Sequence, residues 1–320
     1  MSERCGGGLR FGIITRGVGG NYSVLSEGEA LTSHAKGAFR HDDITPAVGD
    51  FVTLAPRDDG IYLISEIGER KNHLMRPPVS NLDMLFVIVP ICRPKPDTLT
   101  VDKLLSIAEH EDIPASVVIT KCELDSGEAE KIADIYTRAG YRVFKLSAER
   151  GEGVCELRDF ISSLSESTNG APEKYGKYSI SSFAGASGAG KSTLLNALYP
   201  SLSLTVGALS RKTARGRQTT RKAELYDVGG GVLIADTAGF SLIDFEKFDF
   251  FSLEALPFTF REFEPYHGRC RFTKCTHTSE IGCAVIEAVE AGIIARERHE
   301  SYRELYALLR SKNPWDKKPK

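Results

Sequence analysis

The chain has no hydrophobic run long enough to cross a bilayer. Its longest apolar stretch lies within residues 84–91, whereas a membrane-spanning helix needs about 20 apolar residues. No signal-peptide hydrophobic segment follows the first methionine, so we expect a cytoplasmic protein without a membrane partner. The seven cysteines are an odd number in a chain without secretory features, which argues against a disulfide framework.

The chain also lacks a large excess of charge of either sign. The formal net charge of −2 favours no partner by itself, but the basic residues are unevenly distributed. Residues 210–222 contain six basic side chains and no acid, and Arg269, Arg271 and Lys274 surround two later cysteines. Either cluster alone is most simply a solvated surface. Because both flank sites that other residues identify, together they favour a phosphate-rich partner.

The distribution of apolar residues predicts a multidomain α/β protein. Short strand-like segments separated by turn residues fill residues 11–71, which predicts a small β-barrel of the oligonucleotide-binding type. From residue 81 onward, buried strands alternate with helices, which predicts a mostly parallel sheet with helices on both faces. We expect a barrel over 1–73, an α/β domain over 74–243 and a helical domain over 244–320.

Within the α/β part, individual elements are predicted from the apolar pattern. Residues 165–177 are rich in Ser, Gly, Thr, Asn and Pro and show no periodicity, so we interpret them as a linker. The expected strands are 84–89, 115–119, 141–146 and 178–184, and the expected helices are 97–110, 128–139 and 191–198.

A glycine-rich segment after the strand 178–184 predicts a phosphate-binding loop. It reads Gly-Ala-Ser-Gly-Ala-Gly-Lys-Ser and opens the helix at residue 191, which is the context that makes such a motif credible. The glycines allow backbone N–H groups to face phosphate oxygens, and the helix N-terminus adds its dipole. Lys191 is expected to reach the outer phosphates and Ser192 to hold Mg²⁺. The expected nucleotide contacts here are Gly185, Ala186, Ser187, Gly188, Ala189, Gly190, Lys191, Ser192 and Thr193.

The segment Thr120-Lys121-Cys122-Glu123 at the end of the strand 115–119 is a candidate guanine-reading loop. The Glu123 carboxylate can accept from N1–H and the exocyclic amine of guanine, whereas adenine has no N1–H at that edge. Lys121 is expected to lay its aliphatic stem over the ring. The alternative is an exposed strand end with two charges. The pair Ser147-Ala148 follows the next strand, as a second guanine-contacting loop would, and this favours guanine.

A third segment, Asp236-Thr237-Ala238-Gly239, follows an apolar strand near residues 232–235. Asp236 is placed to bind Mg²⁺ through water, and the Gly239 N–H to approach a γ-phosphate. The order along the chain is therefore base loop, phosphate loop and switch, which is rotated relative to an ordinary GTPase. Such a rotation is physically cheap because the termini of compact domains are often close together.

Four residues near the C-terminus have the spacing of a metal site. Cys270, Cys275, His277 and Cys283 supply three thiolates and one imidazole, which is the ligand set of a structural Zn²⁺ without an open position. We expect one zinc ion per chain. The alternatives are reduced, unliganded thiols and, less favoured, a catalytic zinc. We interpret Cys92 and Cys155 as buried apolar residues, and His267 and His299 as ordinary surface histidines.

With these motifs in view, the chain resembles the circularly permuted, small ribosomal subunit-dependent GTPase A family of bacterial ribosome-assembly factors. The resemblance includes 36–40 (KGAFR), 48–50 (VGD), 216–220 (GRQTT), 236–240 (DTAGF) and the cysteine spacing. It implies a barrel of the oligonucleotide-binding type, a permuted GTPase domain and a zinc domain. It also implies a monomer that binds the 30S subunit and 16S rRNA. Its expected activity is hydrolysis of GTP to GDP and phosphate with Mg²⁺, stimulated by the subunit during late maturation.

The chain departs from the family pattern at four residues in three motifs. Thr120 and Glu123 replace the usual Asn and Asp of the base loop, Gln218 stands where the family generally has His, and Ala238 replaces Pro. Because Phe240 occupies the position of the water-orienting glutamine of many GTPases, we expect a slow free enzyme. We expect Gln218 to supply that function once docked on RNA, and Thr219 or Thr220 to complete the Mg²⁺ shell.

Two other interpretations remain open at this point. One is a zinc-stabilised RNA-binding scaffold with a degenerate nucleotide site, and the other is a P-loop ATPase or kinase in which Glu123 does not face the base. For the GTPase, residues 236–242 lead directly into the C-terminal domain. Loss of the γ-phosphate is therefore expected to move that domain relative to the GTPase body and release the protein from the subunit.

Overall fold

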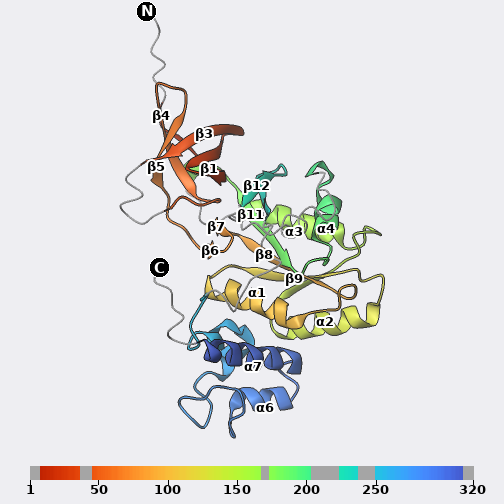
Figure 1. Ribbon diagram of the computed structural model, residues 1–320. Coiled ribbons are helices and arrows are strands. Elements are labelled where there is room, and N and C mark those ends of the chain that lie inside the picture. Colours follow the sequence, from red (N-terminus) through yellow and green to blue (C-terminus); the bar gives the residue numbers. More distant parts are fainter. Residues whose placement is uncertain (1–7, 37–44, 167–172, 203–222, 237–248, 313–320) are drawn as a thin grey trace, which may run out of the picture. The chain divides into compact units, whose positions relative to one another are not determined.

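The computed structural model describes residues 8–36, 45–166, 173–202, 223–236 and 249–312 (Figure 1). The chain forms two compact units, and each combines segments that are far apart in the sequence. The first unit contains 1–83, 158–182 and 212–239, and the second contains 84–157, 183–211 and 240–320. In these described ranges, no helix has the length and apolarity required to cross a bilayer.

The N-terminal part of the first unit is a closed β-barrel, coloured red to orange in Figure 1. Antiparallel pairing joins β1 to β2 and β2 to β3, β3 pairs with β5 in parallel, and β4 pairs with both β5 and β1. The circuit β1-β2-β3-β5-β4-β1 confirms the expected barrel of the oligonucleotide-binding type. The strands are β1 (Arg10–Val18), β2 (Asn21–Ser26), β3 (Glu29–Ala35), β4 (Phe51–Pro56) and β5 (Tyr62–Ile67).

Apolar side chains fill the barrel, and two local features fix its shape. A Cβ added to Gly12 would lie 2.4 Å from the Leu25 carbonyl oxygen, so β1 and β2 approach too closely there for a larger residue. The short 3-10 helix Glu173–Tyr175 packs Tyr175 against Phe11 and Phe51, with ring centroids 5.8 and 5.3 Å apart. The expected linker 165–177 therefore contributes to the barrel core at its C-terminal end.

The first unit also contains strands that lie outside the barrel. In β11 (Ser179–Gly185), residues 179–182 run parallel to β13 (Val232–Asp236), and β12 (Glu224–Asp227) pairs with β13 in the antiparallel sense. β12 also pairs with β1 of the barrel through Arg16 and Glu224. A small ladder joins β6 (His73–Met75) to β7 (Pro78–Ser80).

The second unit contains the expected strand–helix alternation. β8 (Met84–Pro90), β9 (Ala115–Thr120) and β10 (Arg142–Lys145) are parallel, with β9 in the middle. Every residue of β8 and β9 is buried, as expected of strands covered on both faces. The helices of this unit are α1 (Thr98–His110) and α2 (Ser126–Arg138), whereas α3 (Val154–Glu166) begins in this unit and lies mostly in the first. The side chains of Asp97 and Asp125 cap α1 and α2, respectively, by accepting from backbone N–H groups.

The C-terminal part of the second unit is built from short helices around an aromatic core. Phe260, Phe263 and Tyr302 pack with ring centroids 4.9 to 5.3 Å apart. This confirms the predicted helical character of the region. The helices are η4 (Leu256–Thr259), η5 (Arg261–Tyr266), α6 (Ala284–Glu290) and α7 (Arg296–Ser311).

A buried ionic group attaches α7 to the strand–helix part of the same unit. Arg298 donates to both carboxylate oxygens of Glu262, at 2.7 and 3.1 Å, and to Asp102 Oδ1 at 2.6 Å. Arg298 and Asp102 are almost completely buried, and the guanidinium also lies over the Phe260 ring at 4.4 Å. Two peripheral contacts add to this interface, from Arg261 to Glu109 and from Arg138 to the Gly292 carbonyl.

Candidate functional site

The predicted phosphate loop lies between the end of β11 and α4 (Lys191–Leu198). Three glycines are required by its backbone. A Cβ on Gly185 would lie 2.5 Å from the Ile88 carbonyl oxygen, and Gly188 and Gly190 have φ values of 80° and 93°. Other residues rarely adopt such φ values. The loop therefore turns sharply where it passes β8.

Lys191 and the start of α4 provide positive charge at this turn. The Lys191 ammonium donates to the carbonyl oxygens of Gly185 and Ala186, at 2.7 and 3.3 Å. Gly190 occupies the N-cap of α4 and offers no side-chain oxygen to its N–H groups. An anion at this helix N-terminus would meet unsatisfied N–H groups, the helix dipole and an ammonium. The arrangement is therefore chemically suited to phosphate.

The predicted base loop lies directly beside the phosphate loop. β9 ends at Thr120, whose Oγ1 donates to the Ala189 carbonyl oxygen at 2.8 Å. The Lys121 ammonium donates to the Gly188 carbonyl oxygen at 3.2 Å and also to the Arg93 carbonyl oxygen. Segments nearly seventy residues apart are thus joined by two adjacent side chains. The structure therefore places the base loop beside the phosphate loop.

Glu123 has a carboxylate oxygen that its protein neighbours leave unused. Its Oε2 is buried and has no hydrogen-bond partner in the described part of the chain. A buried carboxylate oxygen without a donor is costly, so a ligand with N–H groups at this position would be stabilising. Burial raises the pKa of the neighbouring Cys122 thiol, whose Sγ contacts the Ile119 carbonyl oxygen at 3.4 Å.

The second predicted base-contacting segment, Ser147-Ala148, lies next to this loop. The Cys122 N–H donates to the Leu146 carbonyl oxygen at 3.3 Å, which joins the two segments. Ser147 is fully buried, and its hydroxyl accepts from the Arg150 N–H at 3.2 Å. The backbone of Ser147 bonds to Glu152, so the turn is held from both sides.

Other predicted site residues fall outside what the structure describes. Gln218, Thr219 and Gly239 lie outside the described residues, and only the backbone of Asp236 is described, at the end of β13. Of the three expected Mg²⁺ ligands, Ser192 alone is described at the side-chain level. It lies in the first turn of α4 and is largely buried.

The four predicted metal ligands form one cluster. The ligand atoms of Cys270, Cys275, His277 and Cys283 all lie within 4.8 Å of one another. Cys270 and Cys283 have their sulfurs 3.8 Å apart, and His277 Nδ1 lies 3.5 and 3.3 Å from these two sulfurs. Metal–sulfur bonds of about 2.3 Å in a tetrahedron would place two sulfurs about 3.8 Å apart. The donor set and its spacing therefore fit a tetrahedral metal ion.

Neighbouring residues hold this metal-ligand loop in place. Glu280 accepts from the N–H groups of Thr276, Thr278 and Ser279, at 2.7, 3.0 and 3.1 Å. Burial acts to raise the Glu280 pKa, but the hydrogen bonds from Thr276 and Ser279 outweigh it and lower the pKa to about 2. Burial lowers the pKa of His277, which favours the neutral imidazole that binds metals.

Two residues on α7 support the same loop, and sequence reasoning identified neither of them. His299 was expected on the surface, but it is buried, and its Nε2 lies 2.7 Å from the carbonyl oxygen of His277. The Tyr302 hydroxyl donates to the Thr276 carbonyl oxygen at 2.7 Å. The spacing of His299, Tyr302 and Leu305 places them on one helix face, and this is the pattern that could have revealed them. Cys155 corrects a second expectation, because it is exposed rather than buried.

The fold and its two joined loops define a circularly permuted P-loop GTPase with an N-terminal barrel and a C-terminal region whose three cysteines and one histidine have the arrangement of metal ligands. Residues 67–246 match the RsgA GTPase family, and residues 11–64 match the RsgA N-terminal domain. The chain therefore belongs to the RsgA GTPase family, and it is a GTP hydrolase.

Known proteins similar to this chain cover almost its entire length. The small ribosomal subunit biogenesis GTPase RsgA of Moorella thermoacetica is 38% identical over 91% of this chain and 94% of its own. The protein of the same name from Geobacillus thermodenitrificans is 38% identical over 95% of this chain and 98% of its own.

Two solved structures share the fold. YjeQ from Thermotoga maritima has a TM-score of 0.78 and 32% identity, and the match covers 95% of this chain and 100% of that one. YloQ, described as a circularly permuted GTPase, has a TM-score of 0.72 and 30% identity, with 98% and 99% of the two chains covered.

Proposed function

We propose that this protein binds the small (30S) ribosomal subunit and hydrolyses GTP to GDP and phosphate during late subunit maturation, with the subunit stimulating the reaction. The names of its relatives, small ribosomal subunit biogenesis GTPases, support this role. One observation carries the enzymatic part of the proposal. Thr120 contacts Ala189, so the base loop and the phosphate loop form one site.

In this proposal the nucleotide replaces contacts that the protein makes with itself. The Lys191 ammonium, which now bonds to the carbonyl oxygens of Gly185 and Ala186, turns to the outer phosphates of GTP. The N–H groups of residues 185–193 surround those phosphates. Glu123 accepts from the N1–H and exocyclic amine of guanine, which gives its buried Oε2 a partner. Ser147 and Ala148 form the other side of the base site.

Catalysis requires residues of the basic segment and of the switch. Ser192, Thr219 and Asp236 hold Mg²⁺, which neutralises charge on the β- and γ-phosphates when it is bound. The Gly239 N–H approaches the γ-phosphate. Gln218 orients the attacking water only once the basic segment 210–222 is docked on RNA. The free enzyme is therefore slow, and its subunit-bound form is fast.

The C-terminal cluster holds one structural zinc ion per chain. Three thiolates and one imidazole fill all four tetrahedral positions, so no position is left for a water or substrate. Zinc fixes the loop that lies under α7, and the contacts of His299 and Tyr302 to that loop orient it. We propose that this zinc-dependent domain contacts 16S rRNA and that the protein acts as a cytoplasmic monomer.

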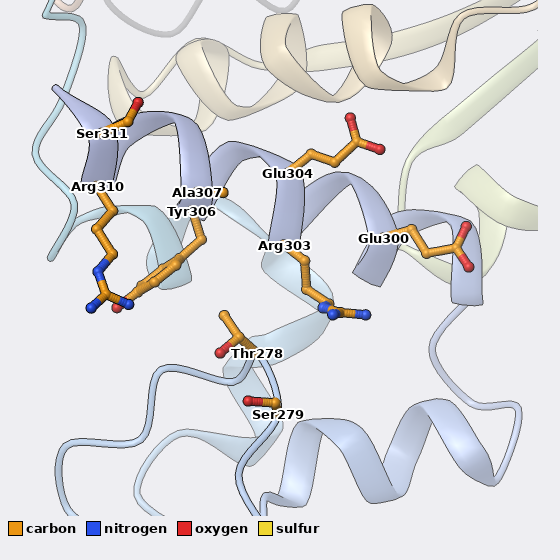
Figure 2. Close-up of a pocket in the computed structure, with 9 residues that line it drawn as sticks. All are labelled: Thr278, Ser279, Glu300, Arg303, Glu304, Tyr306, Ala307, Arg310 and Ser311. Atoms are coloured by element: carbon orange, nitrogen blue, oxygen red, sulfur yellow. The ribbon is translucent and has the colours of Figure 1, made fainter.

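A cavity beside the metal-ligand loop is suited to RNA. It has a volume of about 680 Å³, and Arg303, Tyr306 and Arg310 of α7 face Thr278 and Ser279 across it (Figure 2). In the described part of the chain neither arginine forms an ion pair. Glu300 and Glu304 also line the cavity, so its lining carries no excess positive charge. The contacts that it offers RNA are the two guanidinium groups for phosphate and the Tyr306 ring for a stacked base. Replacing both arginines with glutamine is expected to weaken subunit binding without changing GTP binding.

A GTP hydrolysis assay with and without purified 30S subunits tests the proposal. We expect slow turnover of the free protein and a large stimulation by 30S subunits, with no stimulation by 50S subunits. An RNA-binding scaffold with a degenerate site would bind subunits without hydrolysing GTP. If the protein were an ATPase or kinase, ATP would displace bound guanine nucleotide. A binding competition between ATP and GTP therefore tests that alternative.

A further inference from the structure

Thr120 has only one hydrogen to donate, and the protein uses it. A threonine hydroxyl carries a single donor hydrogen. In this chain it is directed to the carbonyl oxygen of Ala189 at 2.8 Å, and both residues are buried. At the same position an asparagine amide would carry two hydrogens, so it could hold that carbonyl and still donate to a ligand.

The other donors of the base loop are also directed to the protein. The Lys121 ammonium contacts the carbonyl oxygens of Gly188, Cys92 and Arg93. The Cys122 thiol contacts the Ile119 carbonyl oxygen. The unpartnered side-chain atom of this loop is Glu123 Oε2, which is an acceptor. The side chains of the loop therefore offer a ligand an acceptor and no free donor.

Guanine presents donors and acceptors on different parts of the ring. N7 and O6 are acceptors, whereas N1–H and the exocyclic amine are donors. A loop with one free acceptor can bind the edge of guanine that carries N1–H and the exocyclic amine. It has no side-chain donor for N7. We infer that Thr120 is a positioning residue that fastens the base loop to the phosphate loop, and that guanine is selected through Glu123 without readout of N7. The inference rests on the proposed GTP site.

Nucleotide analogues test this directly on the full-length protein. In 7-deaza-GTP a C–H replaces N7, and in ITP the exocyclic amine is missing. We expect 7-deaza-GTP to bind within about twofold of GTP, and ITP to bind about 5- to 100-fold more weakly because part of the buried carboxylate then lacks its donor. A tenfold or greater loss with 7-deaza-GTP would overturn the inference.

Substitutions at Thr120 separate positioning from base reading. Thr120→Val removes the tether and should weaken GTP and 7-deaza-GTP by the same factor, and Thr120→Ser should restore both. Thr120→Asn adds a second donor and should create a preference for GTP over 7-deaza-GTP of about 2- to 10-fold, the value of one hydrogen bond. If residue 120 affected only the stability of the fold, Thr120→Asn would leave the ratio of GTP affinity to 7-deaza-GTP affinity unchanged. Unchanged binding by Thr120→Val would refute the positioning role.

The outcomes also distinguish this inference from the proposed function. If the wild-type protein bound no guanine nucleotide, both would fail. If it bound and hydrolysed GTP but depended on N7, the GTPase proposal would stand and the inference about Thr120 would be wrong.

Discussion

Arg298 donates to Asp102 Oδ1 at 2.6 Å, although 196 residues separate them in the sequence. The contact joins α7, on the C-terminal domain, to α1, which follows β8 of the GTPase sheet. The sequence predicts that the C-terminal domain moves relative to the GTPase body when the γ-phosphate is lost. The buried, ion-paired guanidinium joins this domain to α1. Any such movement must carry α1 and the strands beneath it along.

Substitution of Arg298 should destabilise this interface. Arg298→Met leaves Asp102 and Glu262 buried without their counter-charge, and breaking a buried pair in this way costs about 3–5 kcal/mol. The local free energy of opening of α7, from amide hydrogen exchange, measures the effect. Arg298→Met combined with Asp102→Leu and Glu262→Met should recover most of the loss. A single variant within about 0.5 kcal/mol of wild type, the range of ordinary surface substitutions, would contradict this account.

Glu280 should control retention of the metal. Its carboxylate organises three N–H groups around the ligand loop, and groups that orient metal ligands typically change affinity by about 10- to 100-fold. Glu280→Gln should therefore release zinc faster to a chromophoric chelator. Glu290→Gln, an exposed acid on α6, is the matched control. Equal release rates for the two variants would rule out the organising role.

His73 should titrate below its ordinary range. Burial is the main cause of its lowered pKa, and the nearby Arg70 charge adds to it while Asp50 opposes it. The fold favours neutral His73, whose Nδ1 lies 2.9 Å from Ser80 Oγ. Its stabilising contribution is therefore complete above pH 6.5 and is lost as the pH falls through the folded value. An NMR titration, assigned with His73→Gln, checks the direction, and a midpoint above 6.5 would contradict it.

Gln218 should matter only on the ribosomal subunit. Gln218→Ala is expected to keep the basal rate and to lose about 10²-fold of the stimulated rate, a typical contribution of a group positioned for proton transfer. Gln218→His, which restores the residue usual in the family, should retain stimulation. Single-turnover GTP hydrolysis with saturating 30S subunits measures both variants. Full stimulation of the alanine variant would exclude this role.

Local spacing predicted much of the fold and site. The zinc ligands lie within fourteen residues, and the phosphate loop directly follows its strand. Residues close together in the sequence were therefore enough to predict both features. The contact of Thr120 with Ala189 and the burial of Arg298 depend on residues brought together by the fold. No local pattern specifies such partners. His299 was misjudged for the same reason, because its partner is a backbone carbonyl on another segment.

The rotated motif order also affects how the protein is made. Thr120 leaves the translating ribosome 69 residues before its partner Ala189. At about 5–20 residues per second, that delay is about 3 to 14 s. During this interval β8, β9 and β10 have been synthesised, but nothing yet exists to bind triphosphate. Nucleotide therefore cannot template early steps of synthesis-coupled folding, and the nascent strands depend on their own apolar packing until Lys191 emerges.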